Sequence, residues 1–336
     1  MTIKVGLIGA GVMGGDHARI LSTSVGGAEL VAVSDADRAR AEAVAAAYGG
    51  GVVADAEAVI GNDAVDAVIV ASPDPTHKPL VLACLAAGKP VLCEKPLGLT
   101  TDECLEIIAA ETALGKRLVQ VGFMRRFDPG YRAMKATLDS GDLGQALMLH
   151  CVHRNETAAS YTTSENMIAN TAVHEMDIAR WLLGTDVARV TVVTPRPTRL
   201  AKMQDPQILL FHMADGVVVT VEVFVNCQYG YDVRGELVCE KGTATLTPPH
   251  DITLRQARHD GFGHPADWRP RFAEAYRVEL QAWIDAAAGG PPAGASAWDG
   301  YAATAVAEAG LAALKSGTPA EVTMPARPGL YDCLGG

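Results

Sequence analysis

The stretch Val5–Gly14, which reads VGLIGAGVMG, decides the fold. An apolar run leads here into glycines spaced as G-x-G-x-x-G, a pattern with physical meaning where a buried strand ends and a helix begins. Apolar runs then alternate with alanine-rich segments, as in repeated strand–helix–strand units. We predict strands at Ile3–Ile8, Glu29–Ser34, Ala67–Ala71, Pro90–Cys93 and Leu118–Gly122. The sequence therefore predicts an α/β domain over residues 1–122, built on a doubly wound parallel sheet of the Rossmann type.

The glycines of this stretch predict a dinucleotide site. Gly9 would permit a tight turn, Gly11 the close approach of a pyrophosphate, and Gly14 the packing of the helix on the strand. The backbone N–H groups at Val12 and Met13 begin the helix and would face the phosphates. Taken alone, the motif is also compatible with an ordinary glycine turn.

The second predicted strand favours NAD over NADP. It ends at Asp35, whose carboxylate would accept both hydroxyls of the adenosine ribose. A 2′-phosphate at the same place would meet a like charge. Arg38 lies three residues further on and is the residue that would weaken this preference if it turned toward a phosphate.

The second half of the chain has a different pattern. A helix at Pro129–Ser140 precedes runs in which apolar and polar residues alternate, which is typical of a mainly antiparallel sheet with one open face. These runs are Ala146–His153, Val187–Thr194, Ile208–His212, Val217–Asn226, Glu236–Glu240 and Thr243–Thr247. We predict an α+β domain over residues 123–336 for substrate binding and oligomerisation. Helices at Asn170–Leu183 and Ala273–Ala288 would cover its sheet, and a last helix at Ala297–Ser316 would pack back toward the N-terminal domain.

Composition excludes several classes of function. The net charge is −11 and no cluster of Lys and Arg runs along the chain, so a nucleic acid is not an expected partner. The start of the chain has no signal-peptide pattern, and no stretch approaches the roughly 18 apolar residues of a membrane span. We expect a cytoplasmic protein that does not bind membranes. Seven cysteines without a C-x-x-C pair predict reduced, mostly buried thiols and no zinc site: Cys84, Cys93, Cys104, Cys151, Cys227, Cys239 and Cys333.

After the fourth strand the chain reads Cys93–Leu97, CEKPL, and with its glycine-rich start it resembles the Gfo/Idh/MocA oxidoreductase family. Further stretches resemble the inositol 2-dehydrogenase branch of that family, so that the likeness covers nearly the whole chain. These stretches are Gly122–Phe127, His150–Asn155, Val173–Asp177, Tyr229–Asp232 and Ala297–Tyr301.

The resemblance implies NAD-dependent oxidation of a ring carbinol, with myo-inositol and its 2-keto product as the first expectation. His174 matches the family's general base, and imidazole suits this task because its ordinary pKa lies near working pH. Lys95 matches the lysine that lies beside the nicotinamide and hydrogen-bonds the reacting oxygen. Without that context, a single His or Lys is more often structural or solvated. The resemblance also implies a cis bond before Pro96 and a place for Glu94 at the cofactor site.

The same resemblance implies which side chains surround the substrate. Arg125, His153, Asn155 and Tyr231 would bind the hydroxyls of a cyclic polyol. Each of these is also compatible with a purely structural role. Three residues after the third predicted strand would line the nicotinamide side of the cofactor site: Ser72, Pro73 and His77.

One residue departs from the family pattern. Asn170 stands four residues before His174, where the inositol branch commonly has Asp, and it would lie one helical turn away. An amide can orient the imidazole but supplies no negative charge, so we expect His174 to be less basic and the acid limb of activity to lie at lower pH. Alternatively, the change marks a different substrate within the family.

His174 and Glu175 begin like the zinc motif H-E-x-x-H, but position 178 is Ile and the match fails. We expect Asp177 to support the site by hydrogen bonding and Glu175 to be solvated.

Three alternatives remain open from the sequence. The first is a dehydrogenase for another inositol isomer, and the second is a dehydrogenase for an aldose. The third is a regulator that senses NAD and has no catalytic activity. We also expect a homotetramer that pairs the open sheet faces.

Overall fold

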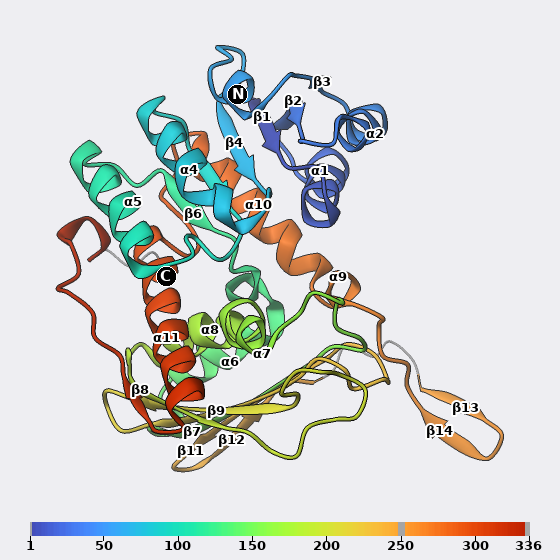
Figure 1. Cartoon of the computed structure of the whole chain (residues 1–336), viewed down its shortest axis with the longest axis vertical. Helices are drawn as coiled ribbons and strands as arrows, with labels where there is room; N and C mark the ends of the chain where they lie inside the picture. Colours follow the sequence, from blue (N-terminus) through green and yellow to red (C-terminus); the bar gives the residue numbers. More distant parts are fainter. Residues whose placement is uncertain (1, 248–252, 333–336) are drawn as a thin grey trace. The chain divides into compact units, whose positions relative to one another are not determined.

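The computed structural model describes residues 2–247 and 253–332, whose contacts form two compact units (Figure 1). The first unit comprises Met1–Phe127, Glu274–Thr304 and Met324–Gly336, and the second comprises Asp128–Ala273 and Ala305–Thr323. The contacts thus group residues 274–304 with the N-terminal part of the chain, whereas the sequence pattern placed them in the C-terminal domain.

A six-stranded parallel sheet forms the centre of the first unit. Its order is β3-β2-β1-β4-β5-β6, which is the strand order of the Rossmann fold. The strands are β1 (Ile3–Ile8), β2 (Ala28–Ser34), β3 (Gly51–Val52), β4 (Ala67–Val70), β5 (Val91–Cys93) and β6 (Val119–Val121). Five of them confirm the predicted strands to within a residue at each end. The prediction missed β3, which has two residues and follows two glycines.

Helices lie on both sides of this sheet. In Figure 1, α1 (Val12–Ser24) and α2 (Arg38–Tyr48) lie on one side, and α4 (His77–Ala86) and α5 (Thr101–Leu114) on the other. Polar side chains fix several helix starts, as where Thr100 accepts a hydrogen bond from the Glu103 N–H at the start of α5. The unit also contains α3 (Ala56–Ile60) and three 3₁₀ turns: η1 (Asp74–Thr76), η2 (Met124–Phe127) and η4 (Gly329–Tyr331). In the described part of the chain, every helix is too short or too polar to cross a membrane.

Helix α10 (Ala273–Ala287) corrects one prediction. We expected it to cover the C-terminal sheet, but it packs within the first unit. Its Gln281 amide exchanges two hydrogen bonds with the backbone of Gly26, and its Tyr276 ring lies edge-on to His17 at 5.8 Å between centroids. Periodicity correctly predicts the helix and its apolar face, but it does not show which sheet that face meets.

A seven-stranded sheet forms the second unit, in the order β12-β11-β7-β10-β9-β8-β15. All its neighbours are antiparallel except β10 and β7, which confirms the predicted mainly antiparallel α+β architecture. The strands are β7 (Ala146–Arg154), β8 (Val187–Val193), β9 (Gln207–Met213), β10 (Val218–Phe224), β11 (Asp232–Cys239), β12 (Gly242–Thr245) and β15 (Ala320–Glu321). Strand β11 begins four residues before the predicted start, because Asp232 and Gly235 are residue types that strands disfavour.

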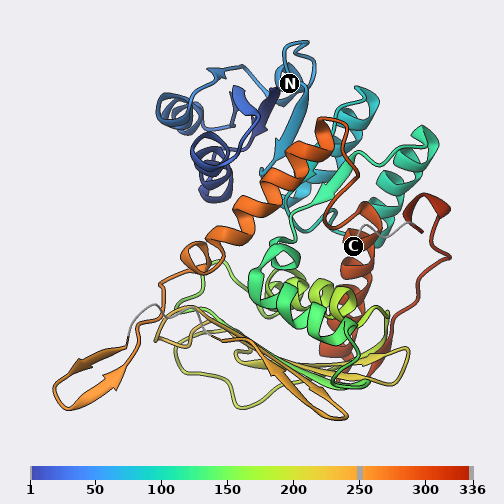
Figure 2. The same cartoon turned by 180° about the vertical axis from the view of Figure 1, so that it is seen from behind.

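One face of this sheet is covered and the other is open. Figures 1 and 2 show α6 (Pro129–Asp139) and α8 (Val173–Leu183) over one face and, among the described residues, no helix over the other. Alternating burial along β7, β9 and β10 fits this arrangement, since Leu149, Leu209 and Val219 are fully buried while their neighbours are not. We call the uncovered face of this sheet the open face; it carries Met148, Leu210 and Thr220.

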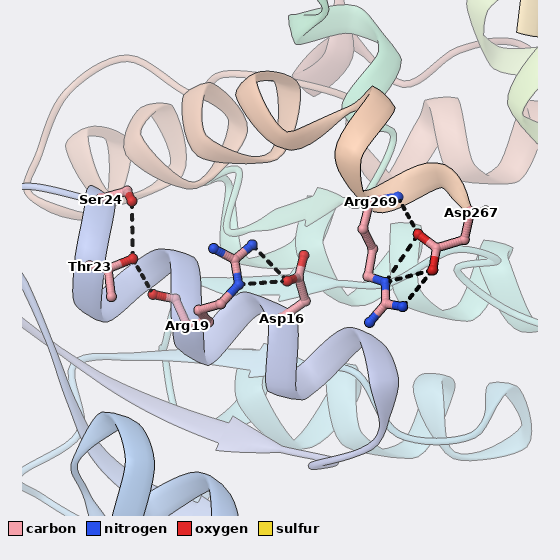
Figure 3. Close-up of polar contacts among 6 residues, drawn as sticks. All are labelled: Asp16, Arg19, Thr23, Ser24, Asp267 and Arg269. Atoms are coloured by element: carbon pink, nitrogen blue, oxygen red, sulfur yellow. Dashed lines mark hydrogen bonds and ion pairs between the residues drawn. The ribbon is translucent and has the colours of Figure 1, made fainter. Parts of the chain in front are cut away.

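Several short elements were not predicted: α7 (Ser164–Asn166), a π-helical segment η3 (Met167–Thr171), α9 (Trp268–Arg271) and a hairpin of β13 (Leu254–Gln256) and β14 (His259–Gly261). Local side-chain contacts stabilise such elements. Asp267 caps α9 and forms an ion pair with Arg269, much as Asp16 and Arg19 pair within α1 (Figure 3).

Helix α11 (Ala297–Ser316) has the predicted bounds. Its contacts assign Ala297–Thr304 to the first unit and Ala305–Ser316 to the second. In the first unit, Asp299 forms an ion pair with Arg126 at 3.0 Å. Gly300 lies where a Cβ would be 2.8 Å from the Cβ of Leu97, so this glycine allows the helix to approach the segment that follows β5.

Candidate active site

The glycine turn after β1 is shaped for a phosphate group. Gly9 has φ +94°, and a Cβ there would lie 2.5 Å from the backbone of Ala71 and Ser72. A Cβ at Gly14 would overlap the carbonyl oxygen of Gly9. By contrast, a Cβ at Gly11 would meet no described atom within 4 Å, and no described side chain caps α1. The N–H groups at Val12 and Met13 are therefore left for a ligand in open space, as the dinucleotide interpretation requires.

Asp35 is held rigidly just after the end of β2. Its two carboxylate oxygens accept hydrogen bonds from the backbone N–H groups of Ala10, at 2.6 Å, and Asp37, at 2.7 Å. A carboxylate oxygen has a further lone pair, so both oxygens retain the capacity to accept a ribose hydroxyl. Arg38 is well exposed and pairs with Glu42 one turn along α2, at 2.8 Å.

The residues after β4 join two loops. His77 is buried, and its ring nitrogens lie 2.6 Å from the carbonyl oxygen of Pro96 and 2.9 Å from that of Ser72. Because carbonyl oxygens only accept, both hydrogen bonds form together only if both ring nitrogens carry protons. Ser72 also shares a hydrogen bond with Thr76 at 2.6 Å, within the turn that begins at Pro73. His77 thus fastens the turn after β4 to the segment that contains Lys95.

Glu94 has a partner that the sequence analysis missed. His17, on the buried side of α1, places its Nε2 2.7 Å from a Glu94 carboxylate oxygen, and neither side chain is open to solvent. Gly122 provides room, since a Cβ there would lie 3.2 Å from the Glu94 carboxyl carbon. Burial alone would raise the pKa of Glu94, but the hydrogen bond from His17, with the charges of His17 and Lys95, holds this pKa below its usual range.

Lys95 follows directly and is half-buried. The expected cis bond between Lys95 and Pro96 is confirmed. Burial lowers the pKa of the Lys95 ammonium, and the nearby charge of Arg125 lowers it further. The carboxylates of Glu94 and Asp74 oppose this change. Arg125 is itself buried in η2, so the first unit brings Lys95 and Arg125 within electrostatic reach of each other.

Within the second unit, three of the predicted substrate residues lie together. His153, near the end of β7, has its Nε2 3.4 Å from the hydroxyl of Tyr231, and the two rings meet edge-on. The His174 ring lies 6.3 Å from the His153 ring between centroids. Both His153 and Tyr231 are buried. The strand and the start of α8 thus form one polar cluster, which contains the proposed base.

Glu175 contradicts the prediction that it is solvated. It is fully buried, and its carboxylate lies 3.1 Å from Nδ1 of His153. The first two turns of α8 are buried on nearly every side, Asp177 included, so a charged residue there must find a partner inside the protein. Glu175 therefore fixes the His153 ring, which the sequence could not show because the two residues lie on different elements.

Asn155 and Asn170 belong to the same unit. The backbone of Asn155 joins that of Phe224 and Cys227, while its side-chain oxygen is buried and has no hydrogen-bond partner among the described residues. This acceptor suits a ligand hydroxyl. Asn170 lies in η3, where the Ala172 N–H bonds the Met167 carbonyl in the π-helical pattern. The predicted α-helix therefore starts at Val173 instead of at Asn170, and the spacing from Asn170 to His174 is not that of a regular α-helical turn.

No group of three or more His, Cys, Asp or Glu side chains in the described ranges is arranged to hold a metal ion. The described cysteines are free thiols, and all of them are buried except Cys227, which is half-buried. They are Cys84, Cys93, Cys104, Cys151, Cys227 and Cys239. Cys333 lies outside the described residues.

Comparison with known families agrees with this geometry. Residues 3–123 match the profile described as "Oxidoreductase family, NAD-binding Rossmann fold", and residues 131–245 match the "GFO/IDH/MocA C-terminal domain". The chain belongs to the Gfo/Idh/MocA family of oxidoreductases. The NAD-binding profile covers the parallel sheet of the first unit, in which the glycine turn, Asp35 and Lys95 lie at the carboxyl ends of the strands.

Individual members of the Gfo/Idh/MocA family are similar over the whole chain. Inositol 2-dehydrogenase 1 of Saccharopolyspora erythraea is 55% identical, in a match that covers 98% of this chain and 99% of that protein. Inositol 2-dehydrogenase of Ralstonia nicotianae is 48% identical over the same shares of both chains. The solved structure of myo-inositol dehydrogenase from Lactobacillus casei, in complex with NAD(H) and myo-inositol, has a TM-score of 0.95 at 35% identity and covers 99% of this chain and 100% of that chain.

Proposed function

We propose that this protein is an NAD-dependent dehydrogenase that oxidises a ring carbinol of an inositol, with myo-inositol as substrate and 2-keto-myo-inositol as product. The observation that carries the proposal is the full-length similarity, at a TM-score of 0.95, to a dehydrogenase solved with NAD(H) and myo-inositol. The polar cluster of His153, His174 and Tyr231 and the half-buried Lys95 supply chemistry suited to such a substrate.

In the proposed reaction, NAD accepts a hydride from the carbinol carbon. His174 takes the hydroxyl proton as general base. The Lys95 ammonium hydrogen-bonds the reacting oxygen and stabilises its developing negative charge, which is larger in the transition state than in the alcohol. Glu94 favours the charged form of Lys95, because its carboxylate is itself kept ionised by His17.

The remaining hydroxyls of the substrate need fixed partners, since a buried hydroxyl without one costs about 1–3 kcal/mol. We assign this role to Arg125, His153, Asn155 and Tyr231, which together supply charged donors, neutral donors and an unsatisfied acceptor. Asn170 orients His174 through its amide. The epimer preferred among inositols depends on the exact direction of these groups.

We infer that the protein uses NAD in turnover, in preference to NADP. The glycine turn, Asp35 and the pairing of Arg38 support this inference. Asp35 is fixed by two backbone N–H groups, and Arg38 is engaged with Glu42. Val12, Met13, Ser72, Pro73, His77 and Glu94 complete the proposed cofactor site. Because the reaction draws on the cellular NAD pool, we propose that the protein works in the cytoplasm.

We further propose that the protein is a homotetramer that pairs open faces. The central strands of the open face alternate apolar residues such as Leu210 with polar ones such as Thr220, and Met148 on that face is exposed. A surface of this kind is suited to association between copies.

The test of the function is a direct assay. Purified protein is mixed with myo-inositol and either NAD or NADP, and reduced nicotinamide is followed by absorbance, with Lys95→Ala and His174→Ala measured in parallel. We expect NAD-linked turnover that falls at least about 1,000-fold in both variants, because each loses a group that acts in the transition state.

Other results would point elsewhere. If turnover occurs only with another inositol or with an aldose, that compound replaces myo-inositol as the proposed substrate. Tight NAD binding without turnover on any polyol would contradict the enzyme and favour a regulator that senses NAD.

A further inference from the structure

Asn155, to which we assign a substrate hydroxyl, is the first residue after β7. The parallel strands β7 and β10 end beside each other, at Arg154 and Phe224. Backbone beyond the end of a strand is mobile unless contacts outside the sheet hold it. The contacts that fix residues 155–158 therefore decide where the Asn155 side chain lies.

The segment after β10 holds the segment after β7. The Asn155 carbonyl accepts a hydrogen bond from the N–H of Cys227 at 3.0 Å, and the Glu156 carbonyl accepts one from the N–H of Gln228 at 3.1 Å. The side-chain amide of Gln228 donates to the same Glu156 oxygen, also at 3.1 Å. Gln228 has φ +69°, a left-handed conformation that a residue with a side chain keeps only where its surroundings fix it. The two segments are therefore joined through both backbone and side-chain contacts.

Asn226 ties these two segments to a third. Its amide oxygen accepts a hydrogen bond from the N–H of Ala158 at 3.1 Å, and its amide nitrogen donates to Oδ2 of Asp205 at 2.9 Å. The other oxygen of Asp205 accepts from the N–H of Val225 at 3.1 Å. Asp205 is fully buried, and Asn226 is 5% exposed. Because a backbone N–H only donates, the amide oxygen must face Ala158, and this leaves the nitrogen for Asp205.

Asparagine is the residue type that this position requires. Its side chain donates at one end and accepts at the other, which alanine cannot do, and aspartate would place a second carboxylate against Asp205. Both ends of the Asn226 amide are engaged inside the second unit. Asn226 therefore acts on a substrate only through the segment that it holds.

We propose that Asn226 is a positioning residue for the substrate, because it holds residues 155–158 where Asn155 contacts a ring hydroxyl. This inference rests on the proposed function, in which Asn155 binds a hydroxyl that does not react. Such a hydroxyl is bound alike in the alcohol and in the transition state, so loss of its contact raises KM for the polyol and leaves kcat unchanged. A small displacement is enough, since binding groups must be held to within roughly 0.5 Å.

The first measurement is steady-state turnover of the full-length protein with NAD and myo-inositol, or with the polyol that the parent oxidises. Asn226→Ala removes both hydrogen bonds without adding bulk. We expect its KM for the polyol to rise at least about tenfold, while kcat and the KM for NAD stay within about threefold of the parent.

A double-mutant cycle with Asn155→Ala separates positioning from a general structural effect. Asn155→Ala alone should raise KM for the polyol at least about tenfold. In that background Asn226→Ala should change KM by less than about twofold, because the contact that Asn226 positions is already absent. A residue that only stabilises the fold would have the same effect in both backgrounds.

Asp205→Asn is a second variant on the same route. An amide has one acceptor oxygen for the two donors that Asp205 now binds, so KM for the polyol should rise about threefold or more. If Asn226→Ala fails to fold, as judged by NAD binding and thermal unfolding, Asp205→Asn decides. Asn62→Ala is the matched control, because the Asn62 amide also accepts from a backbone N–H, that of Ala64 at 2.9 Å, in a turn of the first unit. It should keep the parent's KM for the polyol.

Three outcomes would overturn the inference. If the parent oxidises a polyol and the folded variants keep its KM, Asn226 has no positioning role, although the proposed function stands. An equal rise of KM in both backgrounds of the cycle would show that Asn226 does not act through Asn155. A parent that oxidises no polyol would reject the proposed function, and this inference with it.

Discussion

At the scale of single residues, the proposed chemistry of Lys95 depends on two neighbours that no local pattern singles out. Glu94 supplies a carboxylate beside the ammonium, and His17, 77 residues earlier in the chain, keeps that carboxylate ionised. Glu175 fixes the His153 ring in a comparable way. The family motif therefore predicts Lys95 and His174, but pairs between distant parts of the chain emerge only when the fold brings them together.

Glu94→Gln should move the alkaline limb of the kcat/KM profile to lower pH. The Glu94 carboxylate favours the charged form of Lys95 and so raises its pKa; without it, burial lowers the pKa of Lys95 further. Activity requires the protonated ammonium and is lost as the pH rises through this pKa. Glu106→Gln removes a carboxylate that pairs with Lys78 on the surface and is the matched control. An alkaline limb that stays in place in Glu94→Gln would contradict the proposed coupling.

At the scale of elements, strands and helices with strong periodicity are predictable from the sequence, and their partners are not. Five of the six strands of the first sheet and the bounds of α11 agree closely with the prediction, because buried strands and a long alanine-rich helix have clear apolar patterns. The pattern of α10 shows only that one of its faces is apolar, and that face meets the first unit instead of the second sheet. The π-helical segment η3 was missed because its residues also fit an α-helix.

Two glycines of the turn after β1 should respond differently to alanine. A Cβ at Gly14 would overlap the Gly9 carbonyl, so Gly14→Ala should lower the free energy of unfolding by about 2 kcal/mol or more. Gly11→Ala meets open space and should change stability by less than about 1 kcal/mol while weakening NAD binding at least about tenfold, since its methyl group enters the space proposed for the pyrophosphate. Denaturant unfolding without NAD and calorimetric titration with NAD separate the two effects. Equal loss of stability in both variants would argue against this assignment.

Asn170→Asp should move the acid limb of the profile to higher pH. A carboxylate near His174 favours the imidazolium, so the base is lost by protonation at a higher pH than in the parent. The kcat/KM profile over the acid range measures this change. Asn166→Asp adds the same charge at an exposed position four residues earlier and should leave the limb unchanged. If the acid limb lies at the same pH in Asn170→Asp and in the parent, the side chain at position 170 does not act on the base.

At the scale of the whole molecule, the chain builds a parallel unit for NAD and an antiparallel unit whose sheet has an open face. The fold class could be predicted because the two halves differ in hydrophobic period. The grouping of residues 274–304 with the first unit could not, because composition does not change at those boundaries. The roles proposed for Lys95 and His174 rest on the family resemblance and on the assays proposed above.

Leu210→Glu should disrupt the proposed tetramer. Leu210 lies on the open face of β9, where a charge buried between copies would cost several kcal/mol. Light scattering should then give a mass below four times the 35.2 kDa of the chain, while the parent gives the full value. Leu254→Glu, on the hairpin, is the control at an exposed leucine. A parent mass of 35.2 kDa would reject the tetramer itself.

The division of the chain has a consequence for its synthesis on the ribosome. The first unit includes residues 274–304, and the edge strand β6 is bridged there, where Val121 meets Ala295. When residue 127 leaves the exit tunnel, the nascent NAD-binding unit still lacks α10 and this edge partner, and more than a hundred further residues must be translated before it can close. The nascent chain is thus expected to need chaperone protection until residues 274–304 have emerged, and a truncated chain ending near residue 127 is expected to stay protease-sensitive.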